Sequence, residues 1–136
     1  MEKTSPTVVV IDDSASVHEF FKRCLAGQNI AYRAFTSTAD ALPFLREQRP
    51  DVLFLDIIIP DKDGLTFLQE LRRIPLQADT PVIMITSKDY AQDRMVAKTL
   101  GAVEFVLKPM RLQTIRELIL KFTSGSTAGA GRTANA

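Results

Sequence analysis

The sequence predicts an α/β fold: a single doubly wound (βα)5 domain of three layers, in which helices cover both faces of a five-stranded parallel sheet. Two observations lead to this fold class. Short apolar, β-branched runs alternate along the chain with segments of helical periodicity. Several of these runs show no polar alternation, which is typical of parallel strands buried on both faces. The 136 residues are enough for one domain with a substantial core.

The first predicted unit is a strand, an acidic turn and a helix. The strand Thr7–Ile11 is almost entirely apolar and ends at two acids, Asp12–Asp13. Ser16 and Glu19 then match a capping box, which binds free amides at the start of a helix. We interpret His18 as a surface residue of this helix. Its apolar stripe consists of Val17, Phe20, Phe21, Cys24 and Leu25, and Gly27 closes the helix.

The second unit is less regular. Its strand, Ile30–Phe35, is mixed in polarity, which favours a place at the edge of the sheet. The helix after it carries Leu42 and Leu45 on its apolar side. Pro43 interrupts this pattern, because proline is tolerated only in the first turn of a helix. We therefore expect this helix to start late, near Asp40, or to be kinked.

The third unit contains the most apolar strand, Val52–Leu55, which indicates a central position in the sheet. The strand ends at a carboxylate, Asp56, and turn residues follow at Pro60 and Gly64. Gly64 opens a helix that Pro75 ends. The apolar face of this helix is formed by Leu65, Leu68 and Leu71.

The fourth strand, Val82–Ile85, is apolar and ends at Thr86. The helix after it, Tyr90–Leu100, is poorly amphipathic, so we expect it to be among the least tightly packed helices. Its main apolar residues are Met95, Val96 and Leu100.

The fifth strand, Val103–Leu107, ends in Lys108–Pro109, and the stripe of the last helix runs from Leu112 to Phe122. Because the first, third and fourth strands are the most hydrophobic, short right-handed crossovers favour the strand order 2-1-3-4-5. We expect a disordered lead at residues 1–6, a folded domain at 7–122, and a flexible tail or linker at 123–136, which has no large apolar residue.

Composition and charge exclude several kinds of partner. Hydrophobic residues make up 46% and charged residues 24% of the chain, and the net charge is +1. This balance gives no electrostatic basis for direct binding to nucleic acid or to a membrane. The single cysteine, Cys24, cannot form an internal disulfide, which favours a reducing compartment. Because no segment has the pattern of a membrane span or a signal peptide, we expect a cytoplasmic protein.

Four of the five predicted strands end in residues capable of polar chemistry. The carboxyl ends of parallel strands meet at one rim of the sheet, so we expect these side chains to converge. Two carboxylates about 4 Å apart repel by roughly 1 kcal/mol in water and by about 4 kcal/mol at an effective dielectric constant of about 20. Lys108 supplies one compensating positive charge, and a divalent cation would compensate the remaining negative charge. Oxygen ligands without nearby Cys or His favour Mg²⁺ over zinc as this cation. The converging residues are Asp12, Asp13, Asp56, Thr86 and Lys108.

The complete motif set is Asp12–Asp13, Asp56 followed by Pro60 and Gly64, Thr86, and Lys108–Pro109. As a set, it resembles the receiver domain of two-component response regulators, over about residues 7–122. The resemblance implies a flavodoxin-like fold and a phosphoacceptor signalling switch. It also implies a regulatory domain that promotes its own phosphorylation and dephosphorylation, and not an enzyme acting on other substrates.

The resemblance assigns a role to each residue. Asp56 would accept a phosphoryl group from a sensor histidine kinase or a histidine phosphotransfer protein. Asp13, Asp56 and the backbone carbonyl of Ile58 would hold Mg²⁺ directly, with Asp12 acting mainly through a bound water. Lys108 would pair with a phosphoryl oxygen, and the hydroxyl of Thr86 would bind another.

The resemblance also implies how the signal is passed on. Movement of Thr86 toward the phosphoryl group would let the ring of Phe105 turn, and the face formed by the fourth helix, the fifth strand and the fifth helix would change shape. This face would control a downstream protein partner or an appended output domain, in a monomer or a phosphorylation-dependent dimer. The Lys108–Pro109 peptide bond would be cis.

Two other functions use a similar fold. A haloacid-dehalogenase-like Mg²⁺ phosphatase also has an aspartate nucleophile, but it needs a second acid two residues later, where this chain has Ile58. A flavodoxin-like cofactor carrier needs a Gly/Ser/Thr-rich phosphate loop after the first strand, where Asp12–Asp13 would repel an anion. Both alternatives are therefore disfavoured.

Overall fold

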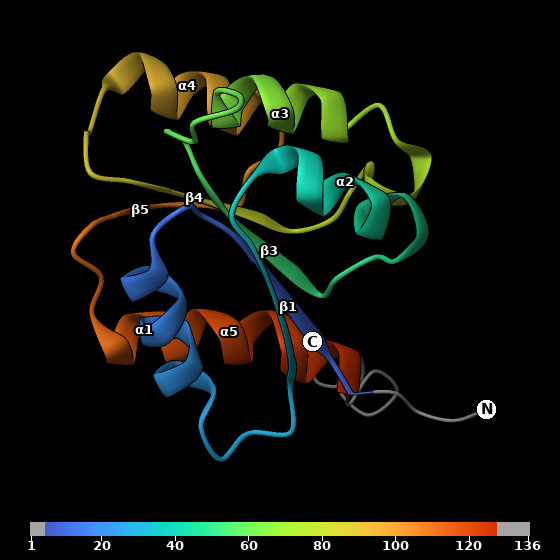
Figure 1. Ribbon diagram of the computed structural model, residues 1–136, viewed down its shortest axis with the longest axis vertical. Helices are drawn as coiled ribbons and strands as arrows, with labels where there is room; N and C mark the ends of the chain where they lie inside the picture. Colours follow the sequence, from blue (N-terminus) through green and yellow to red (C-terminus); the bar gives the residue numbers. More distant parts are fainter. Residues whose placement is uncertain (1–4, 128–136) are drawn as a thin grey trace.

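The computed structural model describes residues 5–127; the first four residues of the expected lead and residues 128–136 of the expected tail lie outside the described part. A five-stranded parallel sheet has the order β2-β1-β3-β4-β5, as predicted. Helices α1 and α5 cover one face, and α2, α3 and α4 cover the other (Figure 1). The strands are β1 Thr7–Ile11, β2 Ala31–Phe35, β3 Val52–Asp56, β4 Val82–Thr86 and β5 Glu104–Leu107. The helices are α1 Ala15–Leu25, α2 Thr38–Glu47, α3 Gly64–Leu71, α4 Ala91–Thr99 and α5 Leu112–Thr127, with a 3₁₀ turn at Pro75–Gln77.

The strands divide their side chains between two hydrophobic cores, because successive residues of a strand point to opposite faces of the sheet. Val9, Leu53 and Met84 pack toward α2, α3 and α4. Phe54 and Ile83 belong to the core with α1 and α5. All residues of β3 and β4 are buried, which explains why these strands are apolar without alternation. The sheet is therefore a rigid support for whatever lies at its carboxyl rim.

Two helix starts differ from the sequence-based expectation. The cap of α1 is Ser14, whose side chain accepts a hydrogen bond from the amide of Val17, so the capping box at Ser16 and Glu19 does not start the helix. Helix α2 begins at Thr38 and contains Pro43, so of the two alternatives the late start near Asp40 was wrong and a kink at Pro43 stays a prediction. The start lies earlier because Ser37 caps the helix by accepting from the amide of Asp40.

Helix α4 is loosely packed, as expected, since among its residues Ala97 alone is buried. Two of its three predicted apolar anchors were wrong, because Val96 is 39% exposed and Met95 still more. Met95 is 68% exposed, whereas Leu100, just after the helix, packs against the core. Within the described residues 5–127, no helix is both long and apolar enough to cross a membrane.

The ends of the described chain are more ordered than expected. Pro6 is buried, and its carbonyl accepts a hydrogen bond from the amide of Ala31, so this part of the expected lead is tied to the sheet edge. Helix α5 continues to Thr127, past the expected boundary at residue 122. Thr123 is buried, and its hydroxyl donates to the carbonyl of Ile119 at 2.7 Å. That bond removes the cost of burying a hydroxyl. The absence of large apolar residues after residue 122 did not indicate that the helix could continue in this way.

Arg72, directly after α3, connects three parts of the fold, and we expect its replacement by alanine to destabilise the protein by about 2 kcal/mol. Its guanidinium donates to the carbonyls of Leu100 at 2.9 Å, Gln77 at 2.9 Å, Thr80 at 2.8 Å and Gly101 at 3.2 Å. Without it, these carbonyls at the end of α4 and after the 3₁₀ turn lose a charged donor. The free energy of unfolding in urea measures the effect.

Arg73→Ala is the matched control, because the neighbouring side chain is exposed. We expect this control to change the free energy of unfolding by less than about 0.5 kcal/mol. Equal losses in the two variants would contradict the structural role of Arg72.

Candidate functional site

The carboxyl ends of β1, β3 and β5 bring three acids and one lysine together. One carboxylate oxygen from each of Asp12, Asp13 and Asp56 lies within 4.8 Å of the other two. The ammonium nitrogen of Lys108 lies 2.9 Å from Oδ2 of Asp12 and 3.3 Å from Oδ2 of Asp56. The structure thus gathers four of the five polar residues that the sequence placed on this rim.

The backbone around Asp56 fixes the position of its carboxylate. Asp56 is the last residue of β3, and the next amide, Ile57 N, donates to the carbonyl of Ile85 on β4 at 3.0 Å. The amide of Ile58 donates to Oδ1 of Asp56 at 3.2 Å. The turn then closes on itself, since the amide of Gly64 donates to the carbonyl of Ile57 at 2.7 Å. Oδ1 is thereby oriented by the chain, while Oδ2 faces Lys108.

The charges of the cluster shift one another's pKa values. Asp56 is 4% exposed; burial, followed by the negative charge of Asp12, raises its pKa, although Lys108 and the amide of Ile58 partly oppose the rise. Burial alone would lower the pKa of Lys108, but the hydrogen bond and charge of Asp12, together with Asp56, outweigh burial and raise it. The lysine therefore stays cationic and offsets one of the three acids.

The donor set fits a hard divalent cation. Oδ2 of Asp12 is buried, and the ammonium of Lys108, 2.9 Å away, is the partner that the described residues give it. Asp13 is exposed, so the cluster is open to solvent on one side. Carboxylate oxygens with access for water are the ligands that Mg²⁺ prefers. Three carboxylates against one ammonium also leave negative charge that a cation would neutralise.

Thr86 lies at the carboxyl end of β4, and Phe105 lies on β5 opposite Met84. Thr86 ends β4, is buried, and accepts a hydrogen bond at Oγ1 from the amide of Lys88 at 3.1 Å. Phe105 on β5 is half-buried, and the guanidinium of Arg94 lies 4.5 Å from its ring centroid. No hydrogen bond or ion pair among the described residues connects either side chain to Asp56. The Lys108–Pro109 bond is cis, as the resemblance implied.

The expectation that His18 is a surface residue was wrong. His18 is 8% exposed, and its Nε2 lies 2.7 Å from the backbone oxygen of Asp12. A signal for this was present in the sequence. His18 stands three residues before Phe21 and seven before Leu25, which places it on the buried side of α1.

Asp61 is a residue that the sequence did not single out. Its carboxylate accepts hydrogen bonds from the amide and the hydroxyl of Thr38, at 3.2 and 2.7 Å, and from the amide of Ala39 at 3.1 Å. The hydroxyl of Thr38 in particular lowers the pKa of Asp61. The loop after Asp56 is thus tied to the start of α2.

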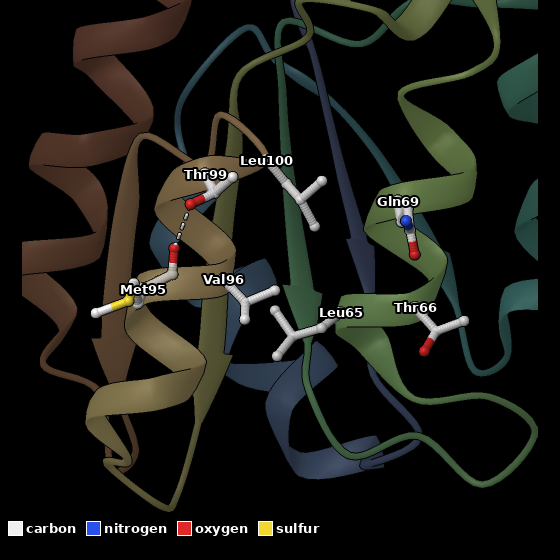
Figure 2. Close-up of a pocket in the computed structure, with 7 residues that line it drawn as sticks. All are labelled: Leu65, Thr66, Gln69, Met95, Val96, Thr99 and Leu100. Atoms are coloured by element: carbon white, nitrogen blue, oxygen red, sulfur yellow. Dashed lines mark hydrogen bonds between the residues drawn. The ribbon is translucent and has the colours of Figure 1, made fainter.

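An apolar groove lies elsewhere on the surface. A groove of about 410 Å³ runs between α3 and α4, and Figure 2 shows Leu65, Val96 and Leu100 directed into it. It contains no charged side chain and none of the residues of the acidic cluster. Its complete lining is Leu65, Thr66, Gln69, Met95, Val96, Thr99 and Leu100. The groove therefore has no means for phosphoryl or metal chemistry.

Comparison with known sequences identifies the family of the chain. Residues 8–120 match the sequence model of the response regulator receiver domain. The transcriptional regulatory protein BaeR of Escherichia coli O6:H1 is 28% identical over 109 residues, which make up 80% of this chain and 44% of BaeR. The protein named "Probable transcriptional regulatory protein TcrX" of Mycobacterium tuberculosis is 30% identical over 128 residues, which are 92% of this chain and 54% of TcrX. The chain spans about half the length of these relatives.

A solved structure shows the same fold. The response regulator receiver domain protein (CheY-like) from Methanospirillum hungatei JF-1 superposes with a TM-score of 0.81, covering 90% of this chain and 97% of that one. The two sequences are 17% identical, so the similarity concerns the fold.

Proposed function

The chain belongs to the response regulator receiver domain family, a family of regulatory signalling domains, and from this premise we propose that Asp56 is its phosphoacceptor. The observation that carries the proposal is the position of the Asp56 carboxylate, 3.3 Å from the ammonium of Lys108 and within 4.8 Å of an oxygen of each of two further acids. The donor would be the phosphohistidine of a cytoplasmic sensor histidine kinase or histidine phosphotransfer protein.

The transfer needs little beyond alignment and charge compensation. An oxygen of Asp56 attacks the phosphorus, the phosphorus–nitrogen bond breaks, and the donor imidazole leaves with the bonding electron pair. The amide of Ile58 holds Oδ1, which leaves Oδ2 on the side of Lys108. The ammonium of Lys108, now 3.3 Å from Oδ2, would pair with an oxygen of the incoming phosphoryl group.

Asp12, Asp13, Asp56 and the backbone carbonyl of Ile58 would hold Mg²⁺. When bound, the ion would neutralise negative charge on the transferred group. In its absence the acids repel one another, since Lys108 offsets only one of them. The same groups, with water, would promote the return of Asp56 to its unphosphorylated form. The domain would then limit the lifetime of its own phosphorylated form.

The signal would leave the site through Thr86 and Phe105. Oγ1 of Thr86 accepts a hydrogen bond from the amide of Lys88, and a phosphoryl group on Asp56 would offer the Thr86 hydroxyl a charged acceptor. Its displacement would free space for the ring of Phe105, and the face formed by α4, β5 and α5 would change. The loose packing of α4 supports this route. A downstream protein or an appended output domain would read that face, in a monomer or a phosphorylation-dependent dimer.

The phosphatase alternative has no support at the site. The residue two positions after Asp56 is Ile58, an apolar side chain that is 55% exposed and cannot protonate a leaving group. The cofactor-carrier alternative also fails, because acids and not phosphate-binding amides follow β1. Family membership and site chemistry both favour the switch.

The proposal is tested with acetyl phosphate as a small phosphodonor. Incubation with Mg²⁺ should add one phosphoryl group, detected by intact mass, and peptide mapping after borohydride reduction should place it on Asp56. Addition of EDTA should prevent uptake. Uptake on another residue, or uptake of the same extent in EDTA, would refute the assignment.

Mg²⁺ alone should also stabilise the protein. A ligand that binds the folded state raises the unfolding temperature, and saturating MgCl₂ should raise it by about 5 °C because repulsion among the acids is relieved. Asp13→Asn should remove most of this rise. Asp40→Asn, an equal charge change on an exposed acid of α2, should keep it. The chain has no tryptophan, so circular dichroism is the suitable probe.

A further inference from the structure

The buried His18 on α1 and the half-buried Tyr32 on β2 form a pair that contacts the backbone of the acidic cluster at Asp12. The Nε2 atom of His18 lies 2.7 Å from the backbone oxygen of Asp12, and its Nδ1 atom lies 2.6 Å from the hydroxyl of Tyr32. A carbonyl oxygen can only accept, so Nε2 carries the proton and donates. In the neutral ring, Nδ1 then accepts from Tyr32.

The tyrosine is well suited to hold the imidazole in this orientation. Burial, followed by the negative charge of Asp12, raises the pKa of Tyr32, so the phenol keeps its proton and remains a donor. Its ring is stacked on Phe21 with centroids 6.4 Å apart and an angle of 11°. Phe21 is fully buried, so the phenol has a fixed platform.

The hydrogen bond from His18 is accepted by the carbonyl of Asp12. The other polar groups of Asp12 are already oriented toward the site or the sheet. The amide of Asp12 donates to the carbonyl of Phe35 at 3.0 Å, and Oδ1 accepts from the amide of Ser14 at 2.9 Å. Oδ2 is left facing Lys108 at 2.9 Å. The carbonyl is therefore the polar group of Asp12 whose direction could still change with the turn from β1 to α1. The hydrogen bond from His18 fixes that direction.

We propose that His18, oriented by Tyr32, is a positioning residue for the proposed Mg²⁺ site: its bond to the Asp12 carbonyl sets the direction of the Asp12 carboxylate and of Asp13 after it. This inference rests on the proposed function. A role in packing alone would not explain why both ring nitrogens are used and why one of them meets the backbone of a cluster residue. Loss of such a partner behind a metal ligand typically weakens metal binding by about 10-fold to 100-fold.

Titration of the full chain with MgCl₂, followed by the amide NMR shifts of residues 12–14, tests the proposal. His18→Phe keeps a ring but removes both nitrogens, and it should weaken Mg²⁺ binding by about 10-fold. His18→Gln should recover most of the affinity, because its amide nitrogen can reach the position of Nε2. Tyr32→Phe should give a smaller loss. Leu25→Ala, which shortens a buried side chain of the same helix without touching Asp12, is the control for general destabilisation.

The outcomes separate this inference from the proposed function. If the unaltered protein does not bind Mg²⁺, the proposed function itself fails. If it binds Mg²⁺ and His18→Phe binds equally well, or if Leu25→Ala weakens binding as much, His18 is merely a core residue and the inference is overturned. Weaker binding in His18→Phe and Tyr32→Phe, with recovery in His18→Gln and no change in Leu25→Ala, establishes it.

Discussion

Asp56→Asn should take up no phosphoryl group from acetyl phosphate under conditions in which the unaltered protein is phosphorylated. The amide lacks the anionic oxygen that attacks phosphorus, and the other acids of the cluster are not held in its place. The variant should nevertheless be folded, because the amide oxygen of Asn can accept the hydrogen bond that Ile58 now donates to Oδ1. Intact mass after incubation with Mg²⁺ and acetyl phosphate measures the loss.

The same variant should be more stable than the parent when EDTA is present. The pKa of Asp56 is raised in the folded state, chiefly by burial and then by Asp12. The protonated form is therefore favoured by folding, and its stabilising contribution is lost as the pH rises through the folded-state pKa. At neutral pH the ionised carboxylate costs stability, and Asn removes this cost. We expect a gain of about 1 kcal/mol at pH 7 that disappears as the pH falls.

The control for both readouts is Asp40→Asn, which removes one exposed carboxylate from α2. It should be phosphorylated normally and gain no stability at pH 7. Phosphorylation of Asp56→Asn at the rate of the parent would refute the assignment of Asp56 as the phosphoacceptor. A loss of stability in EDTA would show that the acidic cluster is not under repulsion.

The sequence predicted the rim of the sheet well because topology alone determines it. Parallel strands with short crossovers deliver their carboxyl ends to one edge, so the acids at the ends of β1 and β3 and the lysine after β5 had to meet. Neither the twist of the sheet nor any rotamer was needed for this conclusion. The order of the strands followed in the same way from the hydrophobicity of each run.

Contacts between elements distant in the sequence could not be predicted in this way. The bonds of His18 to Tyr32 and of Asp61 to Thr38 depend on how a helix and a loop sit against a neighbouring strand or helix, to within about 1 Å. Local rules failed where two similar residues compete. Ser14 and Ser16 both suit a helix cap, and the hydrogen bond of Asp12 with the Ser14 amide fixes the turn so that Ser14 is chosen.

Gly64→Ala should lower the free energy of unfolding by about 3 kcal/mol and impair phosphoryl uptake at the same time. Gly64 is the first residue of α3, and its amide bonds the carbonyl of Ile57. A Cβ atom on it would overlap the backbone oxygen of Asp56 and would lie 2.8 Å from Cα of Ile57. Both contacts are backbone atoms, which cannot rotate away. The turn must therefore shift, and Asp56 must move with it.

Gly27→Ala is the matched control for this second prediction, because it separates backbone strain from crowding at the site. Gly27 has a φ of 81°, which strains any residue with a Cβ, but nothing lies within 4 Å of the added atom. It should cost about 1 kcal/mol and leave phosphorylation and Mg²⁺ binding unchanged. Urea unfolding gives the stability of both variants, and uptake from acetyl phosphate gives their function. If the turn after Asp56 is rigid, the added Cβ atom must displace the Asp56 carboxylate and reduce uptake. Normal uptake by Gly64→Ala would therefore contradict the prediction, because the turn would have changed without moving the acceptor.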